Sequence, residues 1–112
     1  MPESRRRFGR FECRLPVEIS VAGQTQATET INLSLGGMLV ATDLAADFGA
    51  EVEFRLHIPA PAHVVQARGS LMWSHVEGKP ALGVSFEALR PLDVWALLQY
   101  FNAVAAGEST VL

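Results

Sequence analysis

The sequence predicts a mainly β fold, in which a six-stranded antiparallel β-barrel is followed by one C-terminal α-helix. Three observations lead to this prediction. Short segments alternate apolar and polar residues with a period of two, which is typical of half-buried strands. Turn-forming residues separate these segments at the short spacing of an antiparallel barrel. After the last segment, the apolar residues recur with the longer period of a helix.

The strand segments are short and well separated. The first is expected over residues 15–21 and is followed by a turn at 23–24. Residues 51–58 alternate without interruption and end at Pro59, whose nitrogen cannot donate a ladder hydrogen bond. The second and third strands are expected to form a hairpin around the turn 34–37. The six expected strands cover residues 15–21, 26–33, 38–42, 51–58, 64–74 and 82–86.

The helix is expected to begin at Pro91, because proline fits the first helical position and Asp93 favours the first turn. Its apolar face should cap the barrel mouth or pack on a partner. Residues 108–112 are expected to form a frayed tail. The apolar face is expected to comprise Val94, Leu97, Leu98, Phe101, Val104 and Ala105.

Size and composition indicate one globular domain, since the chain has 112 residues, of which 49% are hydrophobic and 19% charged. The single cysteine, Cys13, cannot form an internal disulfide, so we expect a reducing compartment and a cytoplasmic protein. The apolar segment 94–106 is interrupted by Gln99 and Asn102 and is too short and too polar to span a bilayer. We therefore expect no membrane insertion.

Positive charge is concentrated at the N-terminus, although the net charge is -3. The acidic remainder of the chain argues against a nucleic-acid polymer, which needs basic residues spread over a face. A compact anion suits a short basic segment better. We expect a flexible arginine-rich ligand-binding segment at 1–13 and a barrel with its helix at 14–107. Five of the nine basic residues lie in the first fourteen positions, namely Arg5, Arg6, Arg7, Arg10 and Arg14.

Arg6 and Arg10 form an Arg-x-x-x-Arg motif ahead of the first strand. A guanidinium is always charged, offers paired N–H donors to phosphate oxygens and to the acceptor edge of guanine, and can stack on a base. The segment therefore suits a guanine nucleotide. A solvated basic tail is the alternative interpretation.

The segment from Asn32 to Gly37 reads Asn-Leu-Ser-Leu-Gly-Gly. Asn32 and Ser34 are two residues apart and can face one ligand from the same side of a strand. The glycines that follow permit positive φ and let a ligand approach the backbone closely. An ordinary hairpin turn is the alternative, because Asn, Ser and Gly are favoured in turns.

Together with the order of strands and helix, the two motifs resemble the PilZ domain family over nearly the whole chain. The family motifs Arg-x-x-x-Arg and Asp/Asn-x-Ser-x-x-Gly correspond to Arg6, Arg10, Asn32, Ser34 and Gly37. The resemblance implies a PilZ-like split barrel that binds the bacterial second messenger cyclic di-GMP. It implies that the arginines hold phosphate and guanine, that Asn32 and Ser34 hold a guanine edge, and that Gly37 gives clearance for the base. Many members carry Asp at the first turn position. Asn32 has only one acceptor oxygen, so we expect it to bind guanine more weakly than an Asp would.

Secondary candidates surround these motifs. Trp73 can stack on guanine, with packing in the core or at the barrel rim as the alternative. Arg5 and Arg7 flank the arginine motif and could hold a second molecule, because the family takes either one ligand or an intercalated pair. Gly36 extends the glycine turn. The histidines lack metal-site spacing and no nucleophile has a base near it, so we expect no metal, cofactor or catalysis.

The leading hypothesis is a non-catalytic receptor that binds cyclic di-GMP and relays the signal. Without a visible second domain, output should pass to a separate, unidentified protein or through a ligand-dependent homodimer. One alternative is a PilZ-like protein-interaction module that does not bind the messenger. Another is a nucleic-acid-binding barrel that uses the basic segment.

Overall fold

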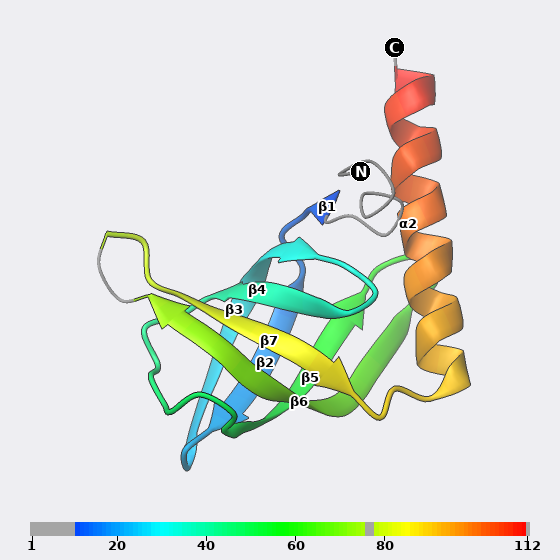
Figure 1. Cartoon of the computed structure of the whole chain (residues 1–112). Coiled ribbons are helices and arrows are strands. Elements are labelled where there is room, and N and C mark those ends of the chain that lie inside the picture. The colour runs from blue at the N-terminus through cyan, green and yellow to red at the C-terminus, as the bar shows by residue number, and fades with distance from the viewer. Residues whose placement is uncertain (1–10, 76–77, 112) are drawn as a thin grey trace, which may run out of the picture.

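The computed structural model describes residues 11–75 and 78–111, with side chains described as far as residue 105. The expected strands and helix are all present, and every strand end lies within two residues of the expected one. The helix continues past residue 107. In chain order the elements are β1 (Phe11–Glu12), β2 (Pro16–Val21), β3 (Gln24–Leu33), β4 (Gly37–Ala41), β5 (Glu51–Ile58), β6 (His63–His75), β7 (Ala81–Glu87) and α2 (Pro91–Val111), as drawn in Figure 1.

The sheet closes into a barrel because β3 pairs along both of its edges. The strands follow the order β3-β2-β5-β6-β7-β4, and β4 pairs with β3 to complete the circle. Every pairing is antiparallel, including the expected hairpin of β3 and β4. The predicted six-stranded antiparallel barrel is therefore confirmed. The short strand β1 is an addition that lies beside the end of β3.

The turn between β2 and β3 matches the twist of the strands it joins. Val21 pairs with Gln24, which leaves Ala22 and Gly23 as a two-residue loop. Both loop residues have positive φ, 54° and 78°, as a type I′ hairpin turn requires. The turn expected at residues 23–24 thus lies one residue earlier.

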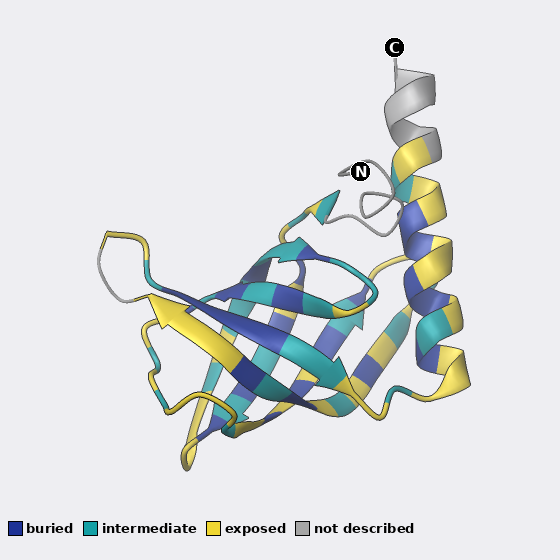
Figure 2. Cartoon of the chain, viewed as in Figure 1, coloured by how far each residue is buried: buried dark blue, intermediate teal, exposed yellow. Residues whose placement is uncertain are grey.

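Alternating residues of the strands fill the barrel interior. β5 shows the pattern most clearly, since every second residue from Val52 to Ile58 is buried while Glu51, Glu53 and Arg55 are exposed. Figure 2 shows the buried positions as dark blue bands along the strands, interrupted by less buried positions. Each fully buried valine, leucine, isoleucine or phenylalanine side chain stabilises the fold by about 1.5–3 kcal/mol. The hydrophobic residues at most 1% exposed on the strands are Val17, Ile19, Leu33, Val40, Val52, Leu56, Val65, Leu71 and Leu82.

Helix α2 covers one end of the barrel with a single face (Figures 1 and 2). The buried residues of this face include Leu97 and Phe101, as expected. Two expected members are wrong, because Leu98 is 41% exposed and Ala105 is also exposed. Ala96 and Tyr100 take their places in the core.

A buried carboxylate sets the rotation of α2. Asp93 is 0% exposed, and its Oδ1 lies 2.8 Å from Nε2 of His63 at the start of β6. The backbone N–H of Arg90 donates to Oδ2 of Asp93 over 3.1 Å, and the Arg90 guanidinium donates to both carboxylate oxygens over 3.2 Å. At 3.6 residues per turn, Leu98 lies about 140° around the helix from Asp93, and Ala105 about 120°. Both are therefore turned away from the barrel.

Candidate functional site

A row of outward-facing residues crosses four strands beside the predicted turn. Asn32 on β3 pairs with Leu39 on β4. Leu39 pairs with Gly83 on β7, which in turn pairs with Trp73 on β6. Directly paired residues point to the same face of a sheet. The register therefore carries Asn32 and Trp73 onto one outer surface of the barrel.

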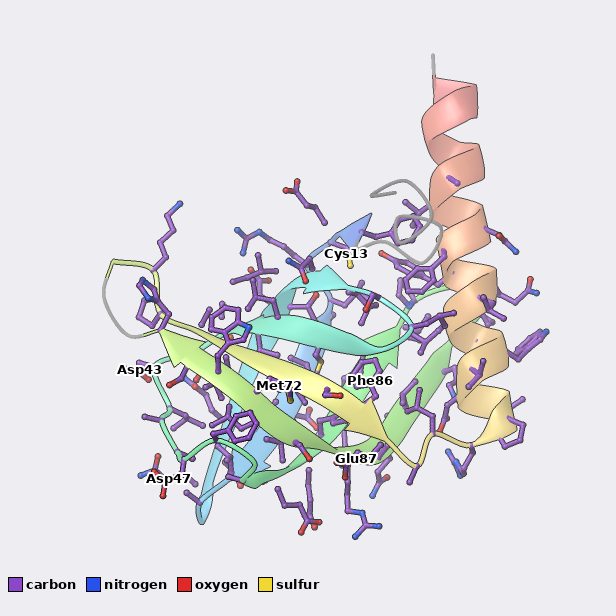
Figure 3. The ribbon with its side chains drawn as sticks, viewed as in Figure 1. Cys13, Asp43, Asp47, Met72, Phe86 and Glu87 are labelled. Carbon is purple, nitrogen blue, oxygen red and sulfur yellow. The ribbon has the colours of Figure 1, made fainter. Side chains whose placement is uncertain are left out.

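Both outer strands of this row contain an irregularity. The extra residue is Ile31 in β3, opposite β4, and Met72 in β6, opposite β7. A bulge breaks the alternation of side chains and redirects them. Two consecutive residues of β6 consequently reach the surface, with Met72 45% exposed and Trp73 44% exposed. Figure 3 labels Met72 where β6 and β7 run side by side.

A pocket of about 350 Å³ lies over this row. The turn between β3 and β4 lines one side, β4 and β7 form the floor, and the bulged part of β6 lines the other side. Four of the predicted site residues, Asn32, Ser34, Gly36 and Gly37, lie together in its wall, and Trp73 completes it. Sequence reasoning missed the remaining lining residues, which are Met38, Leu39, Met72, Gly83, Val84 and Ser85.

The Ser34 hydroxyl organises the turn itself. Its Oγ accepts hydrogen bonds from the backbone N–H groups of Gly36 and Gly37, both over 3.2 Å. It also donates to the Gly37 carbonyl over 3.3 Å, and the Ser34 N–H donates to the same carbonyl over 2.9 Å. One donor and two acceptors are all that a hydroxyl offers. The side chain is therefore fully engaged within the turn.

The two glycines of the turn serve different purposes. Neither adopts the positive φ that glycine permits. A Cβ on Gly37 would overlap the backbone carbonyl oxygen of Val84 on the paired strand β7. A Cβ on Gly36 would meet nothing within 4 Å. Gly37 is thus required by the approach of β4 and β7, whereas Gly36 leaves open space at the surface.

The indole of Trp73 rests on a glycine. A Cβ added to Gly83 would lie 2.6 Å from Nε1 and 2.8 Å from Cε2 of Trp73. The missing side chain lets the ring lie against the floor of the pocket while almost half of its surface stays exposed. An isolated glycine within a strand often marks such a close approach, and this signal was available in the sequence.

The first strand joins the predicted arginine segment to this site. Glu12 of β1 pairs with Asn32, and Phe11 pairs with Leu33, so β1 runs beside the strand end that leads into the turn. The chain is thus already paired before residue 14. Arg5, Arg6, Arg7 and Arg10 lie outside the described residues.

The pocket is uncharged, because none of its lining residues is ionisable. The residues described, 11–75 and 78–111, contain no group of His, Cys, Asp and Glu that could hold a metal ion. In the same part of the chain no helix has the length and apolar character needed to cross a membrane. A charged ligand bound here would need its countercharge from elsewhere in the protein.

A second hollow, of about 660 Å³, lies on the outer face of β2, β5 and β6. It is larger, but the arginines that line it already have carboxylate partners. Arg55 pairs with Glu18 over 3.8 Å, and Arg68 pairs with Glu51 over 3.4 Å. Exposed pairs of this kind are typical of a solvated surface. The neutral pocket with its exposed aromatic ring is therefore the better candidate for a ligand.

Comparisons with solved structures find the same fold in several proteins, of which three are described below. The Bacillus subtilis inhibitor of motility MotI/DgrA has a TM-score of 0.77 and 20% identity, covering 88% of this chain and 50% of its own, so the present chain spans about half of that protein. The PilZ domain of YcgR from Escherichia coli, with c-di-GMP, has a TM-score of 0.67 and 19% identity, covering 94% and 96% of the two chains. Borreliella burgdorferi PlzA, in complex with c-di-GMP, has a TM-score of 0.58 and 19% identity, and the match covers 77% of this chain and 32% of PlzA.

No curated protein matches the chain at a significant level. The family model described as PilZ domain, however, matches residues 4–103. This match includes the arginine motif, the turn of the pocket, the whole barrel and the buried face of α2. The chain therefore belongs to the PilZ domain family.

Proposed function

We propose that this chain is a non-catalytic receptor for cyclic di-GMP in the bacterial cytoplasm. The observation that carries the proposal is the neutral pocket between Asn32 and the exposed Trp73, beside the strand that continues into the arginine motif. A guanine has two flat faces and a polar edge, which suit an indole and an amide. Its phosphates need cations, which Arg6 and Arg10 supply.

Asn32 is the residue proposed to read the guanine edge. Its side chain makes no hydrogen bond to any described residue, and it lines the pocket. The amide offers one acceptor and two donors, so it can both accept from and donate to a base. Because the acceptor is a single oxygen, it satisfies fewer guanine N–H groups than a carboxylate does.

The remaining residues of the two motifs have other proposed roles in binding the ligand. Ser34 holds the turn, so its contribution to ligand binding is smaller than that of an arginine. The clearance for the base that the resemblance assigns to Gly37 fits Gly36 better, since the space above Gly36 is open. Arg5 and Arg7 are proposed to hold a second ligand molecule when an intercalated pair binds. Two of the structural relatives, YcgR and PlzA, were solved with this ligand, which supports the same ligand for this chain.

Calorimetric titration of the whole chain with cyclic di-GMP tests the proposal. Arg6→Ala and Arg10→Ala should each weaken binding by about 1.5–3 kcal/mol, roughly ten- to a hundredfold, if each makes charged hydrogen bonds. Ser34→Ala should cost less. Arg55→Ala is the matched control, because this exposed arginine lies on the other face of the barrel and should leave affinity unchanged. Binding no tighter than millimolar in the parent chain contradicts the proposal.

Two other functions give different results in simple assays. An interaction module that ignores the messenger keeps its cellular function when Arg6 and Arg10 are replaced. A nucleic-acid binder shifts an oligonucleotide in a gel with a steep dependence on salt. The output route is tested by light scattering with and without cyclic di-GMP, since a ligand-dependent homodimer doubles the mass, whereas relay to a separate protein leaves it unchanged.

A further inference from the structure

Gly83, in the floor of the pocket, is not required by its backbone conformation. It lies inside β7, and its φ is outside the left-handed region that favours glycine. A glycine within a strand is destabilising relative to alanine, because it loses more conformational freedom on folding. The reason for a glycine at this position must therefore come from its neighbours in space.

The nearest neighbours of Gly83 all belong to one side chain. A Cβ at this position would lie within 3.0 Å of three atoms, and all three are indole atoms of Trp73. A Cβ on Gly37 or Gly69 would instead come closest to a backbone carbonyl oxygen of a paired strand. Those two glycines serve the approach of strands, whereas Gly83 makes room for the indole alone.

The distances to the indole show how the ring lies. The missing Cβ would be 2.6 Å from Nε1, 2.8 Å from Cε2 and 3.0 Å from Cδ1 of Trp73. Both carbons are bonded to Nε1, and an approach in the plane of the ring would leave them much farther away than the nitrogen. The Cβ direction, which points out of the sheet, therefore meets the face of the ring. The indole lies flat over Gly83, and its other face is turned outward, so that Trp73 is 44% exposed.

The bulge in β6 brings the indole to this place. Leu71 pairs with Val84 of the neighbouring strand β7, and the next pair is Trp73 with Gly83, because Met72 is an extra residue (Figure 1). Without the extra residue, Met72 would pair with Gly83 and Trp73 with Leu82, whose side chain is fully buried. The bulge selects the strand position of the ring, and the glycine sets its tilt.

We propose that Gly83 is a positioning residue that seats the indole of Trp73 flat on β7, so that its outward face is a fixed platform on which a guanine of cyclic di-GMP stacks. The inference rests on the proposed function. A ring that already lies in the orientation of the complex loses little side-chain freedom on binding, which strengthens the stacking contact. A side chain at position 83 would lift the ring from the sheet and tilt the platform.

A double-mutant cycle followed by calorimetry tests whether Gly83 acts through Trp73. Gly83→Ala should weaken cyclic di-GMP binding about tenfold in the parent chain, yet less than about threefold in a Trp73→Ala background, because the ring that it seats is gone. In an Arg55→Ala background the loss should remain about tenfold, since Arg55 lies outside the pocket. The melting temperature of Gly83→Ala should stay close to that of the parent chain, because the displaced ring can move into open solvent. Equal losses in all three backgrounds overturn the proposal.

Proton NMR of the parent chain gives a second test that needs no substitution at Gly83. One Hα of Gly83 takes the direction of the missing Cβ and lies under the indole face, where the ring current shifts a proton upfield. This Hα should be upfield in the parent chain and should return to the ordinary range in Trp73→Ala. It should stay upfield in the complex, because the base stacks on the opposite face of the ring. An upfield shift that is absent, or that disappears when cyclic di-GMP binds, overturns the proposal.

The two tests separate the role of Gly83 from the function on which it rests. If the parent chain does not bind cyclic di-GMP in calorimetry, the proposed function fails. If the parent chain binds and Gly83→Ala binds equally tightly, the positioning role alone fails and the receptor function stands.

Discussion

Replacing Gly37 by alanine should destabilise the fold itself, although Gly37 belongs to the ligand motif. The added Cβ would stand well under 3.0 Å from the Val84 carbonyl oxygen and 3.3 Å from its carbonyl carbon. These are backbone atoms of the strand paired with β4, so no rotamer change can relieve the contact. Overpacking of this kind typically costs about 1–3 kcal/mol. For a domain of this size each kcal/mol lowers the melting temperature by roughly 4–8 °C.

Gly36→Ala is the matched control one residue away. Its Cβ would meet nothing within 4 Å, and its φ lies outside the left-handed region. Stability should therefore be unchanged or raised by about 0.4–1 kcal/mol, because alanine restricts the unfolded chain. Urea unfolding followed by circular dichroism measures both variants, and a midpoint shift at constant slope reports the change in stability.

The opposite pattern of results would refute this reading of the turn. If Gly37→Ala unfolds at the parental urea concentration but loses ligand affinity, then Gly37 serves the ligand and not the approach of β4 to β7. If Gly36→Ala is the more damaging substitution to folding, the packing described for the turn is wrong.

Four further predictions concern the pocket and its supports. Trp73→Ala should weaken cyclic di-GMP binding by about 1–3 kcal/mol through loss of base stacking, with little change in melting temperature, and unchanged affinity would remove Trp73 from the site. Asn32→Asp should tighten cyclic di-GMP binding in calorimetry but lower stability by about a few tenths of a kcal/mol, because the like charge of Glu12 lies directly opposite in β1. Adding Glu12→Gln should restore the stability. If Asn32→Asp binds the ligand more weakly, the role given to Asn32 is contradicted. Burial would by itself raise the pKa of Asp93, but hydrogen bonds from Arg90 and His63 outweigh it and hold the pKa below its ordinary value. A depressed pKa in the folded state contributes stability that is present above the unfolded pKa of about 4 and is lost as pH falls through the folded pKa. Asp93→Asn should therefore lower the free energy of unfolding by about 1.5–3 kcal/mol near pH 7, and the difference from the parent should narrow in acid. A difference that stays constant with pH contradicts this. Burial raises the pKa of the Cys13 thiol, so it should react slowly with a thiol reagent at pH 7 until the protein unfolds, and rapid reaction of the native protein would be inconsistent with the structure.

Strands such as β2 and β5 were predictable because their residues alternate over the length of the strand. Residues 51–58 show one face buried and one exposed, and the prediction matches β5 at both ends. The turn at 34–37 was recognisable from its composition. Both patterns depend only on residues that are close in sequence. Such patterns predict the structure correctly where contacts with distant residues do not change it.

The rotation of α2 was not predictable from hydropathy. Asp93 lies in the first turn of α2, as predicted, but counting Leu98 as core from its apolar side chain was wrong. The sequence did not show that Asp93 is buried, because its partner His63 is far away in the sequence. A buried carboxylate becomes favourable only when such partners are known.

The composition of the pocket was predictable only in part. Asn32 and Ser34 were visible as a motif, but the residues facing them come from β6 and β7 through strand register. The bulge at Met72 is what exposes two neighbouring residues of β6, and a bulge depends on pairing with β7. The strand β1 is two residues long, too short to show any period.

The most direct test of the central claim is an amide NMR titration of the isotopically labelled chain with cyclic di-GMP. The account predicts chemical-shift changes at Asn32, Gly36, Trp73 and Phe11, with the outer face of β2 and β5 unaffected. Saturation at sub-millimolar ligand with this pattern supports a receptor that binds over the neutral pocket. An unchanged spectrum, or changes confined to the hollow around Arg55 and Arg68, would contradict it.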